Sequence, residues 1–237
     1  MAIVSVEEQK PNSGELPVIT LRDAVVFPQA LTPLTIGRPR VKTAVDTAWS
    51  SDKLVIVVSQ KNPRIESPNP EDLYNVGTVC AIRRLWKVDG DYHCAVEGLT
   101  RVYLREFIQL EPFILVKFEE IPQISEKSEE IEALIRNVLA KVKRYTELGG
   151  TLILESAMPI FSTDDPNQLV NLVVHAIDIK TSDKQEILET VSTKDRLEKL
   201  ATLLAQEIKI LELSQKIDSE TQERVGQMTK QAYLKEK

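Results

Sequence analysis

The first half of the chain alternates short aliphatic runs with residues that favour turns. From Leu16 to about Ile121, runs rich in Val, Ile and Leu are broken by Pro, Gly and Asn. Short runs bounded in this way are typical of β-strands. The pattern predicts strands over residues 17–21, 31–36, 54–58, 76–88, 92–104 and 113–121.

Local features refine this interpretation. Pro33 has no N–H group to give to a ladder, so residues 31–36 are expected to form an edge strand. Residues 54–58 are apolar throughout, which indicates burial on both faces. Asp89-Gly90 favours a two-residue hairpin turn, because both turn positions need positive φ. Apolar spacing predicts one helix over residues 39–51, and together these elements indicate a small closed or semi-closed β-barrel-like domain.

After Pro122 the pattern changes to the repeat of amphipathic helices. Residues 131–145 carry apolar side chains at that spacing, follow Ser128 and end before Gly149-Gly150. Asp165-Pro166 is typical of an N-cap followed by proline in the first turn, and the apolar segment 169–179 predicts a helix buried on several sides. Ser182 and Ser192 each have the spacing of a capping box, with Gln185 and Asp195 three residues later.

The last helix is predicted to start near Thr193 and to continue to Lys237. Its apolar stripe thins out beyond Ile217, where polar helix formers dominate, as in a connector through solvent. The predicted fold class is α+β, with a β-rich barrel domain, a helical bundle and a long C-terminal connecting helix. The expected segments are a flexible lead-in over residues 1–15, the β-rich domain over 16–122, the bundle over 123–192 and the long helix over 193–237.

Composition and charge mainly exclude function classes. The chain has 237 residues, 42% of them hydrophobic, which suits one large domain or two small ones. A formal net charge of −6 argues against a broad basic surface for nucleic acid or anionic lipid. No apolar run approaches the roughly 20 residues that span a bilayer. The start lacks the basic region of a secretory signal, so we expect a cytoplasmic protein.

The sequence carries no recognisable catalytic motif. None of the eight glycines builds a G-x-x-x-x-G-K loop, a G-x-G-x-x-G turn or a nucleophile elbow. His93 and Cys94 are adjacent on a predicted strand, so they point to opposite faces and make poor joint metal ligands. With a turn at Asp89-Gly90, Cys94 lies opposite Leu85 and Cys80 opposite Leu99. We therefore expect no catalytic residue, no metal site and no pairing of the two cysteines.

Two further expectations concern single positions. Gly37 and Gly77 are predicted to occupy turns that need an unusual φ. The positive charges of Arg83-Arg84 and of Arg101 and Arg105 are expected to lie on a solvated strand face.

Several ordered motifs resemble one family. Residues 17–28 (PVITLRDAVVFP) and 32–38 (TPLTIGR) are similar to the opening of the Lon amino-terminal domain. The resemblance continues through VVSQK at 57–61, DLYNVGTV at 72–79, VEGLTR at 96–101, DKQEILET at 183–190, DRLEKL at 195–200 and YLKE at 233–236. It covers residues 16–237, although Ala232 and Lys237 depart from the family's pattern of an aromatic pair and a glutamine.

The resemblance implies a PUA-like β-domain followed by a bundle and a connecting helix. It also implies a homo-hexameric parent enzyme with an ATPase module and a Ser–Lys protease domain. Neither module is in this sequence, so no cofactor is expected here, and ATP and Mg are expected only in the ATPase module. The long final helix favours a fragment of such a protein, with a stand-alone relative as the other possibility.

The implied function is a non-catalytic one. This region would recognise unfolded or damaged protein substrates and couple them to the ATPase and protease core. An accessible apolar surface beside a sheet edge suits such substrates, and the candidate contacts are Leu31, Pro33, Leu34, Trp86 and Tyr92.

Two alternatives stay open. The chain could be an oligomer-assembly and gating module with little substrate selectivity, or the PUA-like fold could bind RNA, which its acidic balance argues against. The expected partners are unfolded proteins and other subunits of a homo-hexamer, without nucleic acid or membrane.

Overall fold

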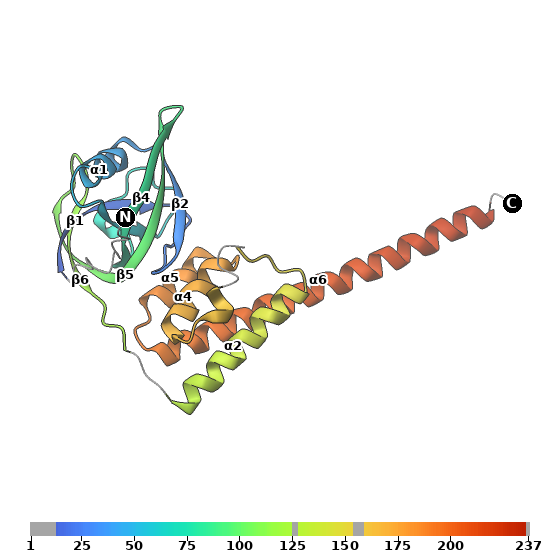
Figure 1. Cartoon of the computed structure of the whole chain (residues 1–237). Helices are drawn as coiled ribbons and strands as arrows, with labels where there is room; N and C mark the ends of the chain where they lie inside the picture. The colour runs from blue at the N-terminus through green and yellow to red at the C-terminus, as the bar shows by residue number, and fades with distance from the viewer. Residues whose placement is uncertain (1–12, 125–127, 154–158, 236–237) are drawn as a thin grey trace, which may run out of the picture.

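The computed structural model of the chain describes residues 13–124, 128–153 and 159–235 (Figure 1). Strands form the amino-terminal half, helices form the carboxyl-terminal half, and the last helix extends far beyond both. This arrangement confirms the predicted α+β fold class.

Six strands form one sheet that closes on itself. The strands are β1 (Ser13–Leu21), β2 (Leu31–Ile36), β3 (Leu54–Ser59), β4 (Val76–Val88), β5 (Asp91–Gln109) and β6 (Leu115–Glu120). Their order is β2-β5-β4-β3-β1-β6, and β5 also pairs with β6. The second half of the long strand β5 therefore closes a barrel, whereas its first half pairs with β2, which stays outside the closure as the predicted edge strand.

The barrel core lies on both sides of β3, as its continuous apolar sequence predicts. Val55 and Val57 pack in one cluster with the buried face of α1 (Pro39–Trp49). Leu54, Ile56 and Val58 pack in a second cluster with residues of β1, β4, β5 and β6. Between the barrel strands, a short 3-10 turn, η1 (Pro70–Asp72), follows β3.

The helical half contains α2 (Glu129–Glu147), α4 (Pro166–Ala176), α5 (Thr181–Glu189) and α6 (Thr193–Lys235). Three predicted caps are present, because Ser128 accepts a hydrogen bond from the N–H of Ile131, Asp165 from that of Asn167 and Ser192 from that of Asp195. The capping box predicted at Ser182 is wrong. The helix begins two residues earlier, at Thr181, and its N-cap Lys180 makes no side-chain cap. Thr181 donates its hydroxyl to the Asp23 carbonyl.

The two halves share a continuous apolar core. Val25, Phe27 and Ala30, in the connection between β1 and β2, pack with the buried face of the bundle. Polar contacts follow the same boundary, since Gln185 donates to the carbonyl of Val76 at 3.0 Å. Arg101 also lies there and is 2% exposed, so the expectation that it sits on a solvated strand face is wrong.

Strand β1 begins at Ser13 and pairs with β6 from that residue. Residues 13–15 of the expected lead-in therefore belong to the barrel. Residues 1–12, residues 125–127 of the expected linker and residues 236–237 lie outside the described part of the chain.

The hairpin between β4 and β5 turns where predicted, with φ of 50° at Asp89 and 86° at Gly90. Cys94 pairs with Leu85 as expected, but Cys80 pairs with Gly98 and not with Leu99. The reason is a bulge between Ile82 and Arg84, which inserts one extra residue into β4 and shifts the register beyond it.

The predicted reason for Gly77 is also wrong. The glycines with positive φ in the described ranges are Gly14, Gly90 and Gly149, so neither Gly37 nor Gly77 needs that conformation. At Gly77 a Cβ atom would lie 2.7 Å from the Val57 carbonyl oxygen. Close packing of β4 on β3 explains this glycine.

Candidate functional site

One opening remains in the barrel, between β1 and β2. Strand β1 pairs with β6 over residues 13–17 and with β3 over residues 18–21, so its second half has a neighbouring strand on one side only. Among the strands that the structure describes, β2 pairs with β5 alone. Two strand edges thus border the opening without a partner strand. On β1, the Val18 N–H donates to the Ile114 carbonyl and the Thr20 carbonyl accepts from Arg38, so β2 is the edge that can act as a template for the backbone of another chain.

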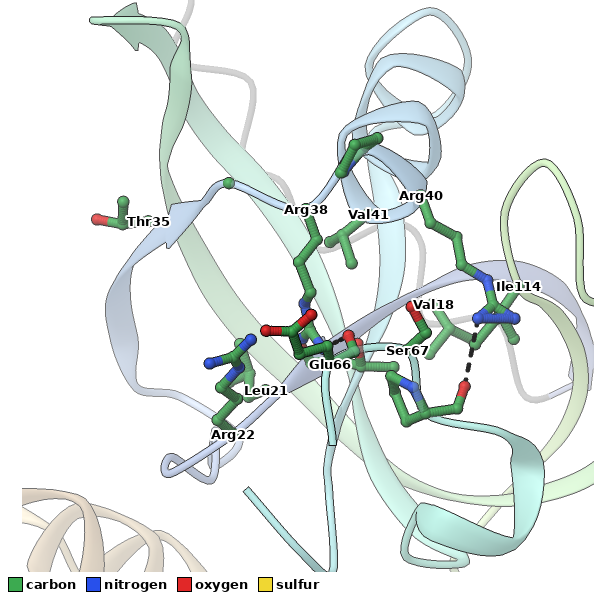
Figure 2. Close-up of a pocket in the computed structure, with 14 residues that line it drawn as sticks. Val18, Leu21, Arg22, Thr35, Arg38, Arg40, Val41, Glu66, Ser67 and Ile114 are labelled. Atoms are coloured by element: carbon green, nitrogen blue, oxygen red, sulfur yellow. Dashed lines mark hydrogen bonds between the residues drawn. The ribbon is translucent and has the colours of Figure 1, made fainter. Parts of the chain in front are cut away.

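A cavity of about 650 Å³ lies at this opening (Figure 2). Its floor is apolar, since Val18, Val41 and Ile114 line it and each is less than 7% exposed. Its wall is basic, because Arg22, Arg38 and Arg40 also line it. The other lining residues are Thr20, Leu21, Thr35, Gly37, Pro39, Glu66, Ser67 and Pro68.

Arg38 holds the parts of the wall together. Its Nη1 donates to the side-chain oxygen of Gln60 at 2.7 Å and to the main-chain oxygen of Glu66 at 3.2 Å, and its Nη2 donates to the Thr20 carbonyl. The residue is the N-cap of α1, so its side chain connects the start of this helix with β1 and with the loop after β3.

Gln60 fixes that loop from inside. It is 2% exposed, and its Nε2 donates to the carbonyl of Ile65 at 2.8 Å while its oxygen accepts from Arg38. A buried amide whose donor and acceptor are both used holds its neighbours in one arrangement. The wall of the cavity therefore has a fixed arrangement, although a loop forms part of it.

Among the described residues, the positive charge of Arg38 has no acidic partner at this wall. All three acceptors of Arg38 are neutral oxygens. Burial lowers the pKa of Arg38, and the positive charges of Arg22 and Arg40 lower it further. Burial and the neighbouring positive charges both disfavour the cationic form of Arg38.

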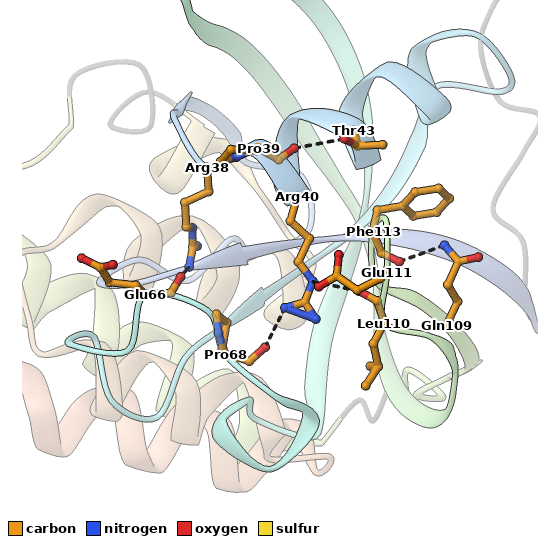
Figure 3. A network of polar contacts seen from close by, with 10 residues as sticks. All are labelled: Arg38, Pro39, Arg40, Thr43, Glu66, Pro68, Gln109, Leu110, Glu111 and Phe113. Atoms are coloured by element: carbon orange, nitrogen blue, oxygen red, sulfur yellow. Dashed lines mark hydrogen bonds and ion pairs between the residues drawn. The ribbon is translucent and has the colours of Figure 1, made fainter.

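The two neighbouring arginines leave this imbalance largely in place. Arg40 donates to the main-chain oxygens of Leu110 and Pro68 (Figure 3), and its ion pair with Glu111 spans 3.5 Å to a side chain that is 76% exposed, which makes it a weak one. Arg22 is exposed and makes no hydrogen bond or ion pair within the described ranges. Glu66 supplies the one carboxylate among the residues that line the cavity.

The substrate contacts predicted on β2 divide between its two faces. Leu31 is 59% exposed and Pro33 is exposed as well, on the outer face of the strand together with Thr35. Leu34 is 7% exposed and packs in the barrel core. Successive side chains of a strand point to opposite faces, so Leu34 faces inward while Leu31 and Pro33 face outward. The expectation of an accessible Leu34 is therefore corrected.

The aromatic pair of the hairpin divides in the same way. Trp86 is 46% exposed and stacks on His93, with ring centroids 5.9 Å apart. Tyr92 is 8% exposed, and its hydroxyl donates to Asp46 of α1 at 2.9 Å. The expectation of Tyr92 as a contact residue is corrected by its burial between the hairpin and α1.

The exposed members of the predicted set lie on one face. Thr35 pairs with His93, and His93 pairs with Trp86 on the next strand, so these three residues form a row across β2, β5 and β4. Pro33 and Leu31 continue the outer face along β2, away from the cavity at Thr35. Leu31, Pro33 and Trp86 therefore share the outer face of the sheet, with Trp86 level with Thr35 at the cavity end of β2 and Leu31 at the other end.

The arginines of the wall were missed from the sequence alone. Their signal was present, because Gly37-Arg-Pro-Arg40 places two cations around a proline at the start of a helix, where the helix dipole already favours anions. Arg22 follows β1 directly, at the point where the strand leaves the barrel.

The described ranges contain no group of three or more His, Cys, Asp or Glu residues placed to hold a metal ion. Within them, no helix has both the length and the apolar character that crossing a membrane requires. Cys80 and Cys94 are buried free thiols. Burial raises the pKa of both, that of Cys94 to about 11, so neither carries the thiolate of a reactive cysteine.

Comparison with known proteins identifies relatives of this chain. Among curated proteins, it is 36% identical over 232 residues to the Lon protease of Koribacter versatilis and 33% identical over 231 residues to that of Heliobacterium modesticaldum. Each alignment covers 97% of this chain and 28% of the relative, so the chain spans a little over a quarter of their length.

Two solved structures have a similar fold. The N-terminal domain of Mycobacterium avium complex Lon protease aligns with a TM-score of 0.65 at 22% identity, covering 81% of this chain and 98% of that one. The Lon N-terminal domain protein from Xanthomonas campestris aligns with a TM-score of 0.57 at 14% identity, covering 80% and 98%. At these identities the likeness establishes the fold.

The family model described as the ATP-dependent protease La (LON) substrate-binding domain matches residues 15–206, which include the barrel, the cavity and the packed part of the bundle. The chain therefore belongs to the family of Lon substrate-binding domains.

Proposed function

We propose that this chain recognises unfolded or damaged proteins and couples them to the ATPase and protease modules of a longer Lon protein. The observation that carries the proposal is the opening between β1 and β2, where two strand edges without a partner strand border a cavity. Exposed Leu31, Pro33 and Trp86 lie on the adjoining face. The chain itself is proposed to carry no catalytic residue.

The physical basis is what an unfolded chain exposes. Its backbone N–H and C=O groups and its apolar side chains are free, whereas a folded protein has satisfied or buried them. A segment that adds to the edge of β2 would pair its backbone there and place alternate side chains on the neighbouring surface. Each contact is weak, but several copies of the site in the proposed cytoplasmic homo-hexamer would raise the avidity.

A backbone NMR titration tests this proposal. The chain is titrated with a permanently unfolded protein and, separately, with the same protein in its folded form. We expect shifts confined to residues 18–22, to β2 and to the outer face of the β4–β5 hairpin, and only with the unfolded form. Equal shifts with both forms, or shifts confined to α6, would contradict it.

A second candidate function is oligomer assembly and gating. The observation that favours it is an exposed stripe on α6, where Ile210, Leu213 and Ile217 are each more than half exposed at helical spacing. Sedimentation equilibrium of the chain and of its Leu213→Glu variant distinguishes the two. Self-association that the variant abolishes would support assembly, and a monomer at all concentrations would reject it.

A further inference from the structure

The cavity combines two features that suit one kind of ligand. Its wall carries Arg22, Arg38 and Arg40, and no carboxylate pairs with Arg22 or Arg38 within the described ranges. Uncompensated guanidinium groups at a partly buried site favour an anion that accepts hydrogen bonds in a plane, as carboxylates do. The first turn of α1 adds the positive end of a helix dipole to the same wall.

The floor sets a second requirement. Val18, Val41 and Ile114 close the bottom of a cavity of about 650 Å³ (Figure 2), and Leu21 leaves partly exposed apolar surface beside them. Such a surface favours an apolar group over water, at about 25 cal/mol for each Å² removed from solvent. The ligand must therefore present an anion and an apolar group within a few ångströms of each other.

We propose that this cavity binds the carboxyl-terminal residue of a polypeptide, with its α-carboxylate on Arg22 and Arg38 and its apolar side chain against Leu21 and the floor of Val18, Val41 and Ile114. The inference rests on the proposed function and names which part of an unfolded chain the site takes. A chain terminus fits both requirements, because the α-carboxylate and the last side chain leave the same Cα atom. The carboxylate of an Asp or Glu side chain has no apolar side chain of its own at that position.

The rest of the peptide follows from the strand geometry. In a parallel ladder, the N–H and C=O groups of one residue point to the same side of the strand, and those of the next residue point to the opposite side. Leu21 accepts from the N–H of Gln60, which follows β3, whereas Thr20 directs its carbonyl to the opposite edge, toward Arg38. The last residue of a ligand would lie at this edge.

The preceding residues of the ligand would run along β2. From Thr35 at the cavity to Leu31, the strand covers about 13 Å. An extended segment of roughly four residues spans that distance, past the exposed side chains of Pro33 and Leu31. The recognised unit is therefore a short extended carboxyl-terminal segment with an apolar last residue.

The experiment compares synthetic peptides by calorimetric titration into the full chain. The reference probe is acetyl-Thr-Val-Thr-Val-Leu with a free carboxylate, and the second is the same peptide as its terminal amide. A third, acetyl-Thr-Val-Thr-Val-Asp amide, carries its only carboxylate on a side chain. We expect the amide and the Asp peptide each to bind about tenfold more weakly than the reference, which is the loss of one charge-assisted hydrogen-bonded pair.

Three variants locate the effect. Arg22 makes no contact that folding depends on, so Arg22→Gln should weaken the carboxylate peptide about fivefold and leave the amide unchanged. Glu66→Gln should tighten the carboxylate peptide, since it removes the one anion of the lining. Arg64→Gln is the matched control. Arg64 is an exposed arginine in the loop that carries Glu66, but it does not line the cavity.

The outcomes separate this inference from the proposed function. If the unfolded protein binds at the opening but acid and amide peptides bind equally, or Arg22→Gln weakens both alike, the carboxylate inference is overturned and the proposed function stands. Tight binding of the Asp peptide would assign the wall to acidic side chains and reject the terminal-carboxylate site. If neither the peptides nor the unfolded protein bind, both proposals are rejected.

Discussion

The Nη1 atom of Arg101, on barrel strand β5, lies 2.8 Å from the carbonyl oxygen of Leu188, near the end of α5. The same nitrogen donates to the carbonyl of Thr190 at 2.6 Å. The last carbonyls of a helix have no partner within the helix and carry the negative end of its dipole. A cation from the barrel therefore provides hydrogen bonds to the unpaired carbonyls of a bundle helix. Burial nevertheless lowers the pKa of Arg101 to about 10, because water no longer solvates its charge.

Replacing this arginine tests the contact. Arg101→Met keeps an unbranched chain but removes the guanidinium, which leaves the carbonyls of Leu188 and Thr190 without this donor, so we expect the free energy of unfolding to fall by about 2–4 kcal/mol. Urea denaturation followed by circular dichroism measures it. Arg105→Met is the control, since Arg105 is exposed on the same strand and should change stability by less than about 0.5 kcal/mol. Equal losses in both variants would contradict the assignment.

Two leucines of β2 separate folding from binding. Leu34→Asp places a charge in the barrel core and should destabilise the chain by about 4 kcal/mol or more. Leu31→Asp should leave the unfolding midpoint nearly unchanged, because Leu31 is 59% exposed, and should weaken binding of an unfolded protein several-fold. Thermal unfolding and the NMR titration together check the pair. A Leu31→Asp variant that binds normally would remove β2 from the proposed surface.

Two glycines should respond to alanine for different reasons. At Gly98 a Cβ atom would lie 2.1 Å from the carbonyl oxygen of Phe27, so Gly98→Ala must displace the connection that carries Phe27 into the shared core. We expect a loss of at least about 2 kcal/mol. Gly90 has open space around it but a φ of +86°, so Gly90→Ala should lose only about 1 kcal/mol. Chemical denaturation ranks them, and the reverse order would contradict this explanation.

The two cysteines should be protected until the chain unfolds. Both thiols are buried, and the pKa of Cys94 is raised from 9.0 to about 11 by that burial. A thiol reagent at pH 8 should therefore modify neither residue in the native chain and both in denaturant. Between pH 9 and 11 the unfolded thiol loses its proton before the folded one, so this group's contribution to stability is present below pH 9 and falls across that window. Rapid labelling of the native chain would contradict the burial.

The strands and helices could be predicted closely because their signals are local. The period of apolar residues placed β2, and proline, serine and aspartate placed the starts of α1, α2 and α4. The bulge beyond Ile82 left no such signal, since it depends on how β4 crosses β5. It was enough to move the partner of Cys80 by one residue.

The cavity and the shared core could not be predicted in this way. Leu31 and Leu34 have the same chemistry, and only the register of β2 on β5 decides which of them faces the solvent. Arg101 resembles any arginine of an exposed strand until the bundle packs on it. The cavity wall joins Arg22, Arg38 and Glu66 from separate loops. A hydrophobic pattern carries no information about which loops meet in the fold.

Helix α6 is 43 residues long, or about 65 Å at the rise of an α-helix, and it runs unbroken from the bundle into the solvent. Its buried residues Leu197, Leu200 and Leu204 follow one face of the helix into the bundle core, and α6 runs beside α2 in Figure 1. A mechanical pull on the far end would therefore act as shear on this stripe and load all its contacts at once, so that many small dispersion attractions resist together. The same pull at a right angle would peel them apart one turn at a time. The direction of an applied force, and not its size alone, decides whether such a helix transmits the load or detaches.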